Sequence, residues 1–164
     1  MNESGFHLSE PAFHIVLVRP EIPQNTGSIA RLVAATRSRL HLIEPLGFSL
    51  EDRYLKRAGL DYWPLVDLCV YPGWERFALE HPDERFKYFS ARAARSYLDT
   101  SYTRGDWLVF GSETKGLGAE FLRDRSEAAF NIPIFEPGVR SLNLANAVSI
   151  VLYEGIRQSG LALA

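Results

Sequence analysis

The sequence is poor in residues that form cross-links. Its 164 residues include one cysteine, Cys69, so no disulfide can form within the chain. Cys69 lies in the apolar run PLVDLCVY, where a thiol usually behaves as a small buried hydrophobe. This excludes a disulfide-stapled scaffold and fits a reduced, cytoplasmic setting.

Metal ligands and long apolar runs are also scarce. The four histidines, at positions 7, 14, 41 and 81, lack both the spacing and the neighbouring cysteines of a zinc site. No stretch approaches the ~18 apolar residues of a membrane span. The first residues lack the basic and then apolar order of a signal peptide. We therefore expect neither a metal nor a membrane association.

Positive charge is not in excess, because 18 lysines and arginines face 20 acidic residues and the net charge is −2. A general attraction to nucleic acid is not expected, although a local basic patch can still bind RNA. Two short basic clusters stand out: Arg53, Lys56 and Arg57, and then Arg92, Arg95 and Arg104. Each is either a solvated surface or a contact to an RNA backbone.

Apolar, β-rich runs alternate with helix-like stretches along the chain. The expected strands are 13–18, 39–44, 65–71, 85–91, 106–111 and 128–134. The expected helices are 25–37, 50–58, 73–80, 117–124 and 141–158. This alternation predicts an α/β fold with a mainly parallel sheet. We expect a single domain over residues 13–164, preceded by a polar extension at 1–12.

Three unusual loops follow expected strands: RPEIPQNTG, GSETKGLG and FEPGVRSLN. In open α/β sheets, ligands bind beyond the carboxyl ends of the strands. Each loop alone could be an ordinary turn, but parallel strands would bring all three to one edge. The second loop is neither a P-loop nor G-x-G-x-x-G, which argues against a nucleotide-dependent oxidoreductase.

Polar residues in and after these loops are candidates for a site. Asn25 or Thr26 would cap the first helix, and Ser141 would cap the last one. Arg31 lies among small residues, where it is either solvated or directed at a phosphate. Glu113 is either a surface carboxylate or an acceptor for a hydroxyl or amine.

The last helix carries two poor helix formers, Asn143 and Asn146, on an otherwise apolar stripe. They require polar partners, from a helix–helix interface or from a ligand. Gly155 in the same helix costs roughly 1 kcal/mol relative to alanine, which indicates close packing there.

Three ordered motifs carry a resemblance to a known family: NTGSIARL at 25–32, LVFGSETKGL at 108–117 and IPIFEPGVRSLNLANAVSIVLYE at 132–154. Together they resemble the SPOUT superfamily of RNA methyltransferases, in its SpoU branch of ribose 2′-O-methyltransferases. The stretches PEIPQNTG, HLIEPLGF and KRAGLDYW are similar to the small, single-domain members that act on the wobble cytidine or uridine of tRNA.

The resemblance implies an α/β knot with a C-terminal trefoil, a homodimer, S-adenosylmethionine as cofactor and tRNA as substrate. The matched cofactor positions are Phe89, Gly111, Glu113, Gly116, Ile132, Ile134, Ser141 and Leu142. The matched active-site positions are Asn25, Arg31, Glu113, Ser141 and Asn143. For RNA binding we expect Arg53, Lys56, Arg57 and Arg140 to contribute.

Methyl transfer to a ribose hydroxyl needs an oriented nucleophile and removal of its proton. The matched motifs contain no histidine to act as the base. A guanidinium has a pKa above about 12, so we interpret Arg31 mainly as a phosphate clamp that orients the ribose. The alternatives are a 2′-O-methyltransferase for another tRNA or rRNA position, and a non-catalytic RNA-binding protein of this fold.

Overall fold

The computed structural model describes residues 5–53, 55 and 62–161. The predicted RNA-binding residues Lys56 and Arg57 lie outside the described residues, as does part of the helix expected at 50–58. Within the described part of the chain, no helix is both long enough and apolar enough to cross a bilayer.

The centre of the fold is a parallel sheet, which has seven strands in the described residues. The strands are β1 (His14–Val18), β2 (Arg39–Ile43), β3 (Asp67–Tyr71), β4 (Phe86–Phe89), β5 (Arg95–Ser96), β6 (Trp107–Phe110) and β7 (Ala129–Asn131). Their order is β3-β2-β1-β6-β4-β7-β5, and every pair is parallel. The expected α/β class and parallel sheet are confirmed, whereas the trefoil threading stays a prediction.

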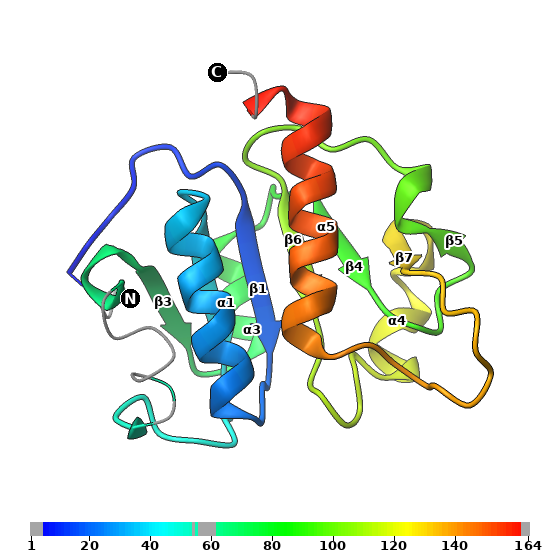
Figure 1. The fold of residues 1–164 in the computed structure, drawn as a ribbon, viewed down its shortest axis with the longest axis horizontal. Helices are drawn as coiled ribbons and strands as arrows, with labels where there is room; N and C mark the ends of the chain where they lie inside the picture. The colour runs from blue at the N-terminus through cyan, green and yellow to red at the C-terminus, as the bar shows by residue number, and fades with distance from the viewer. Residues whose placement is uncertain (1–4, 54, 56–61, 162–164) are drawn as a thin grey trace.

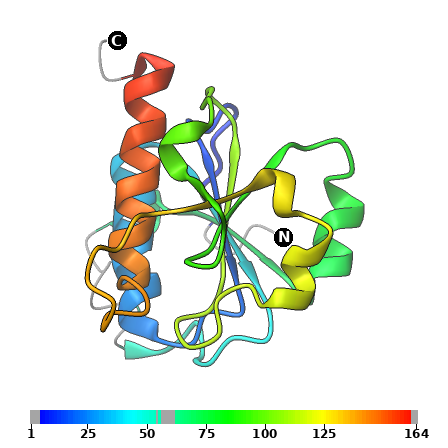
Figure 2. The same ribbon diagram turned by 90° about the vertical axis from the view of Figure 1, so that its right-hand side faces the viewer.

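Helices cover both faces of this sheet. The helices whose bounds lie within the described residues are α1 (Pro23–Ala35), α3 (Trp74–Glu80), α4 (Ala119–Arg123) and α5 (Leu144–Ser159). Helices α1 and α5 stand side by side on one face (Figure 1), and α3 and α4 lie on the other (Figure 2). The short 3-10 turns are η1 (Trp63–Leu65), η2 (Tyr97–Asp99) and η3 (Ser126–Ala128).

Side chains of strand β1 and the residue before it pack into the hydrophobic cores on both faces of the sheet. Phe13, Ile15 and Leu17 are fully buried on the side of α1 and α5, while Val16 belongs to the core on the other side. A parallel strand is buried on both faces, and the sequence here is correspondingly a continuous apolar run. Gly155 brings α5 close to β1, since an added Cβ would lie 2.9 Å from the Phe13 ring. The close packing expected at this glycine is confirmed.

Both expected helix caps are wrong in detail. Helix α1 begins at Pro23, after Ile22, and has no side-chain cap, so Asn25 and Thr26 lie inside its first turn. Proline is tolerated at this position because the first amides of a helix have no partner within the helix. The cap of α5 is Asn143 in place of Ser141, and its side chain accepts from the Asn146 amide at 3.2 Å.

Residues near the N-terminus pack against the sheet. The Leu8 side chain is buried, and its amide donates to the Asp67 carboxylate at 2.8 Å. Arg39 donates to the same carboxylate oxygen through Nε at 2.8 Å and to the Leu8 carbonyl through Nη2 at 2.5 Å. These bonds fix Leu8 over the starts of β2 and β3.

Histidines far apart in the sequence meet beneath α3, and no local pattern in the sequence indicates this. Short contacts link the His14 and His41 rings (2.9 Å), then His41 and the Tyr71 hydroxyl (3.1 Å), then that hydroxyl and His81 (3.2 Å). Trp107 stacks on His14 with 3.9 Å between ring centroids. The described residues contain no group of three or more His, Cys, Asp or Glu side chains that could hold a metal ion.

Burial lowers the pKa of His14 to about 3 and lowers the pKa of His41 well below its ordinary value. Both rings are therefore neutral in the folded protein at pH 5, whereas the unfolded chain binds protons there. Stability should fall as the pH drops through about 6.5, and the His14 ring alone should account for about 2 kcal/mol of this fall at pH 5. Urea unfolding at pH 7 and pH 5 measures this loss.

The variant His14→Phe should shrink the loss between pH 7 and pH 5 by about 2 kcal/mol, whatever it does to stability at pH 7. The variant His7→Gln supplies the control, because it removes an exposed histidine and leaves both buried rings in place, so the loss due to those rings should remain. An identical pH dependence in all three proteins would contradict the assignment of neutral buried rings.

Candidate active site

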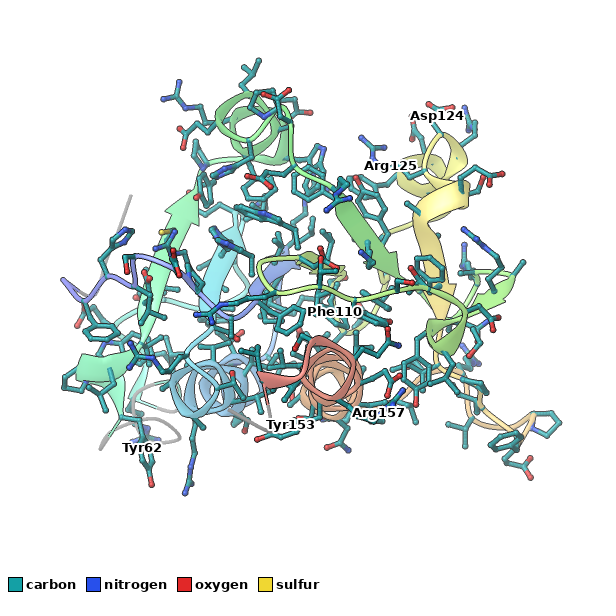
Figure 3. The ribbon with its side chains drawn as sticks, turned by 90° about the horizontal axis from the view of Figure 1, so that it is seen from above. Tyr62, Phe110, Asp124, Arg125, Tyr153 and Arg157 are labelled. Atoms are coloured by element: carbon teal, nitrogen blue, oxygen red, sulfur yellow. The ribbon has the colours of Figure 1, made fainter. Side chains whose placement is uncertain are left out.

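The loops singled out in the sequence meet at the carboxyl edge of the sheet. Residue Leu17 of β1 pairs with Phe110 of β6, which pairs with Phe89 of β4. Phe89 in turn pairs with Phe130 of β7, so the four strands end level with one another. Figure 3 shows Phe110 near the middle of the sheet, over α5. The loops that follow these strands therefore all begin at the same edge of the sheet.

A cavity of about 320 Å³ lies at this edge. All eight positions predicted for the cofactor line it: Phe89, Gly111, Glu113, Gly116, Ile132, Ile134, Ser141 and Leu142. Phe89, Ile132 and Leu142 give it apolar walls, while hydroxyls and charged groups line other parts. Such a cavity suits a ligand with a flat apolar part and a polar or charged end.

Gly111 is required by the tight course of the β6 loop. The loop doubles back so that the Gly116 amide donates to the Ser112 carbonyl at 2.9 Å. A Cβ on Gly111 would lie 2.0 Å from the Gly116 carbonyl carbon, a distance that no side chain can adopt. Gly116 itself has φ = 60°, which favours glycine. Backbone atoms, with no side chain between, therefore form this wall of the cavity.

Glu113 joins the β6 loop to the start of α1. Its carboxylate accepts from the Glu21 amide at 2.9 and 3.1 Å and from the Ile22 amide at 2.7 Å. Burial raises the pKa of Glu113, although the two backbone amides act in the opposite direction. The sequence left two alternatives for Glu113, a surface carboxylate or an acceptor for a hydroxyl or amine. Instead it binds backbone amides at the N-terminus of a helix, where a negative charge is favourable.

Asn25 and Asn143 join the first helix to the last. The Asn143 side-chain amide donates to the Asn25 side-chain oxygen at 3.0 Å, and Asn25 is buried. The partner predicted for Asn143 is thus a residue of the opening motif. Asn146, the second asparagine of α5, is exposed.

Three predicted active-site residues, Asn25, Arg31 and Asn143, are not among the residues that line the cavity, and Arg31 lies apart from the other two. It is exposed on α1, its guanidinium carbon lies 4.7 Å from the centroid of the Tyr62 ring, and it donates to the Tyr62 hydroxyl at 3.2 Å. Tyr62 lies at the periphery of the molecule on the side of α1 (Figure 3). Glu113 and Ser141, by contrast, are both in the cavity wall.

Of the two described residues among those predicted to bind RNA, Arg53 and Arg140, only one lies at the cavity. Arg140 lines the cavity, whereas the exposed Arg53 does not. Two further cations, Arg92 and Lys115, line the cavity and were not among the predicted site residues. Arg92 follows β4 in a fourth loop at the carboxyl edge, so its place after an expected strand was the signal that could have found it.

Replacing Glu113 tests whether the site depends on its two amide contacts. The variant Glu113→Gln removes the charge and turns an NH₂ group toward amides that need acceptors. We expect the free energy of unfolding to fall by about 1–3 kcal/mol, the usual cost of losing a bond to a charged group. Urea denaturation measures this fall, and faster hydrogen exchange at the Ile22 amide would locate it.

The matched control is Glu84→Gln, which alters an exposed loop carboxylate that has no hydrogen bond among the described residues. Equal stability losses in the two variants would show that the Glu113 contacts contribute nothing particular to the fold.

Several known proteins are similar to this chain in both sequence and fold. Residues 12–153 match the model of the SpoU rRNA Methylase family. A tRNA (cytidine(34)-2′-O)-methyltransferase of Burkholderia ambifaria is 48% identical over 151 residues, which cover 90% of this chain and 96% of that protein. A protein of the same name from Saccharophagus degradans is 45% identical over 151 residues, covering 92% of this chain and 97% of that protein.

One solved structure is described as giving structural insights into the 2-OH methylation of C/U34 on tRNA. It superposes with a TM-score of 0.83 at 49% identity and covers 89% of this chain and 95% of that chain. The matched family model spans most of the chain, including all three loops that surround the cavity. The chain belongs to the SpoU rRNA Methylase family.

Proposed function

We propose that this protein transfers a methyl group from S-adenosylmethionine to the ribose 2′-hydroxyl of nucleotide 34, a cytidine or uridine, in tRNA. The observation that carries the proposal is the single cavity that gathers all eight matched cofactor positions. Relatives at 45–48% identity, named tRNA (cytidine(34)-2′-O)-methyltransferases, support the choice of substrate. A tRNA substrate also agrees with the expected cytoplasmic setting.

The residues at the cavity fit this cofactor. Phe89, Ile132 and Leu142 offer apolar surface for an adenosine, and the Gly111 backbone permits a close approach. Arg92 or Lys115 can meet the carboxylate of its methionine part by charge. Bound there, S-adenosylmethionine supplies a methyl group on a positively charged sulfur.

The protein's own task is to place the ribose and to assist the loss of its proton. Among the described residues, none that lines the cavity is a histidine, so the described lining offers no neutral imidazole as the base. Ser141 and Arg140 in the wall can contact the ribose and its phosphate. The hydrogen bond between Asn25 and Asn143 holds the segment that carries Arg140 and Ser141 against α1.

Arg31 does not line the cavity of its own chain, so a role in the reaction requires a second copy of the protein. We propose a homodimer in which the outer surface of α1 and α5 meets its copy, so that Arg31 serves the partner's cavity. Apolar groups on that surface support this, since Ile150 is 37% and Tyr153 54% exposed on α5. Figure 3 shows Tyr153 on the side of α5 that faces away from the sheet.

The test of the proposed reaction is transfer of labelled methyl from S-adenosylmethionine to a tRNA that lacks 2′-O-methylation. After nuclease digestion, we expect label on the ribose of nucleotide 34. The matched control is the same tRNA with a 2′-deoxynucleotide at position 34, which has no hydroxyl to accept the methyl group. Label at another ribose, or equal label in both tRNAs, would overturn the assigned position.

The role of Arg31 is tested by Arg31→Ala in the same assay. Losing the clamp should lower kcat/KM for tRNA by at least ~100-fold, the scale of a positioned group in proton transfer, with the affinity for S-adenosylmethionine unchanged. Arg76→Ala is the control, since Arg76 is an exposed arginine of α3 on the other face of the sheet. If Arg31→Ala turned over within about threefold of wild type, the proposed role of Arg31 as a phosphate clamp would be wrong.

A further inference from the structure

A second cavity, which shares Arg92 with the first, lies beside it at the edge of the sheet. Its volume is about 600 Å³, and it lies between the segment after β4 and the segment formed by α4 and η3. The charged residues that line it are Arg92, Arg95, Arg123 and Glu127, and alanines form much of the rest. We call this cavity the edge groove. Its small side chains leave room for a ligand close to the backbone.

The charge of the edge groove is positive, with three arginines against one glutamate. Arg95 is held in place, because it donates to the Glu127 carbonyl and its guanidinium lies 4.8 Å from the Phe130 ring centroid. Arg92 and Arg123 have no side-chain partner among the residues that the structure describes. Two free guanidinium groups beside a fixed one form an arrangement that suits several phosphates better than one carboxylate.

Arg92 lines both cavities, so positive charge continues from the first cavity into the edge groove. Arg104, grouped with Arg92 and Arg95 in the sequence, lies elsewhere. It precedes β6 at the opposite edge of the sheet and donates to the Glu10 carbonyl at 3.3 Å. The fold thus selects two of the three arginines of that cluster and adds Arg123 from α4.

We propose that the edge groove binds backbone phosphates of the tRNA next to the nucleotide being methylated; this rests on the proposed function. The chemistry of the groove favours phosphates over bases, because arginines line it and no aromatic ring does. The chain as a whole carries a net charge of −2 and cannot attract RNA by its overall field. A local run of guanidinium groups leading from the reaction site supplies that attraction.

The experiment uses Arg123, which lines the edge groove but not the first cavity. The full-length variants are Arg123→Gln and Arg123→Glu. The control is Arg85→Gln, an exposed arginine that precedes β4 at the opposite edge of the sheet. Binding of unmodified tRNA is measured across a salt series without cofactor, and affinity for S-adenosylmethionine and methyl transfer are measured separately.

We expect weaker tRNA binding for Arg123→Gln and still weaker binding for Arg123→Glu. The slope of log affinity against log salt should fall by about 1 for Arg123→Gln, the value for one lost phosphate contact. KM for tRNA should rise, while kcat and the affinity for S-adenosylmethionine stay at wild-type values. Arg85→Gln should match wild type in every measurement.

The possible failures are distinguishable. Wild-type tRNA affinity and salt slope in both Arg123 variants would overturn the edge groove and leave the proposed methylation standing. If wild type transfers no methyl to tRNA but Arg123→Gln still weakens tRNA binding, the proposed reaction falls and the groove stands. A loss of S-adenosylmethionine affinity equal to the loss of tRNA affinity would show a structural defect and overturn the groove.

Discussion

The contact of the Glu113 carboxylate with the amides of Glu21 and Ile22 is the interaction on which the site depends. It joins a loop after β6 to the start of α1, across 91 residues of sequence. Helix α1 has no side-chain cap of its own, so this carboxylate supplies the negative group that a helix N-terminus favours. The same contact fixes the β6 loop over the cavity. One half-buried carboxylate therefore contacts both the helix start and the loop of the site.

The parallel sheet makes that contact possible. Four strands end level, and the loops that follow them have only a short distance to cover. Within this frame the bond from Asn143 to Asn25 ties the last loop to the first helix, as Glu113 ties the middle loop. The three loops are thus held through α1. A residue of α1 that changes its packing would act on all three at once.

Much of this was predictable from the sequence, because local patterns decide it. Both faces of a parallel sheet are buried, so its strands read as apolar runs, and six of the seven described strands fell within expected ranges. Strand β5 was not predicted, because a strand of two residues is too short to show a periodic pattern. The loops at the site were found because glycine, proline and asparagine interrupt apolar runs where parallel strands end.

The features that could not be predicted depend on contacts between residues far apart in the sequence. Asn25 looks like a cap by local rules, but the helix starts two residues earlier, at Pro23, and the distant Glu113 carboxylate accepts from the Ile22 amide just before it. The contacts among His14, His41 and Tyr71 join residues separated by 27 and 30 positions, and no ligand spacing announces them. Arg31 is exposed on α1, but its contact with Tyr62 lies beyond any local pattern.

The distribution of charge explains how a slightly acidic chain can suit an RNA substrate. Its cations are not spread evenly: Arg92, Lys115 and Arg140 line the first cavity. Many acidic groups are occupied instead in the fold, as Asp67 is by Arg39, and Asp106 is by Lys87 at 2.7 Å. Screening over about 10 Å makes the local arrangement of charge outweigh the net value. An arginine free of such pairs at the carboxyl edge therefore contributes more to RNA binding than the total charge would indicate.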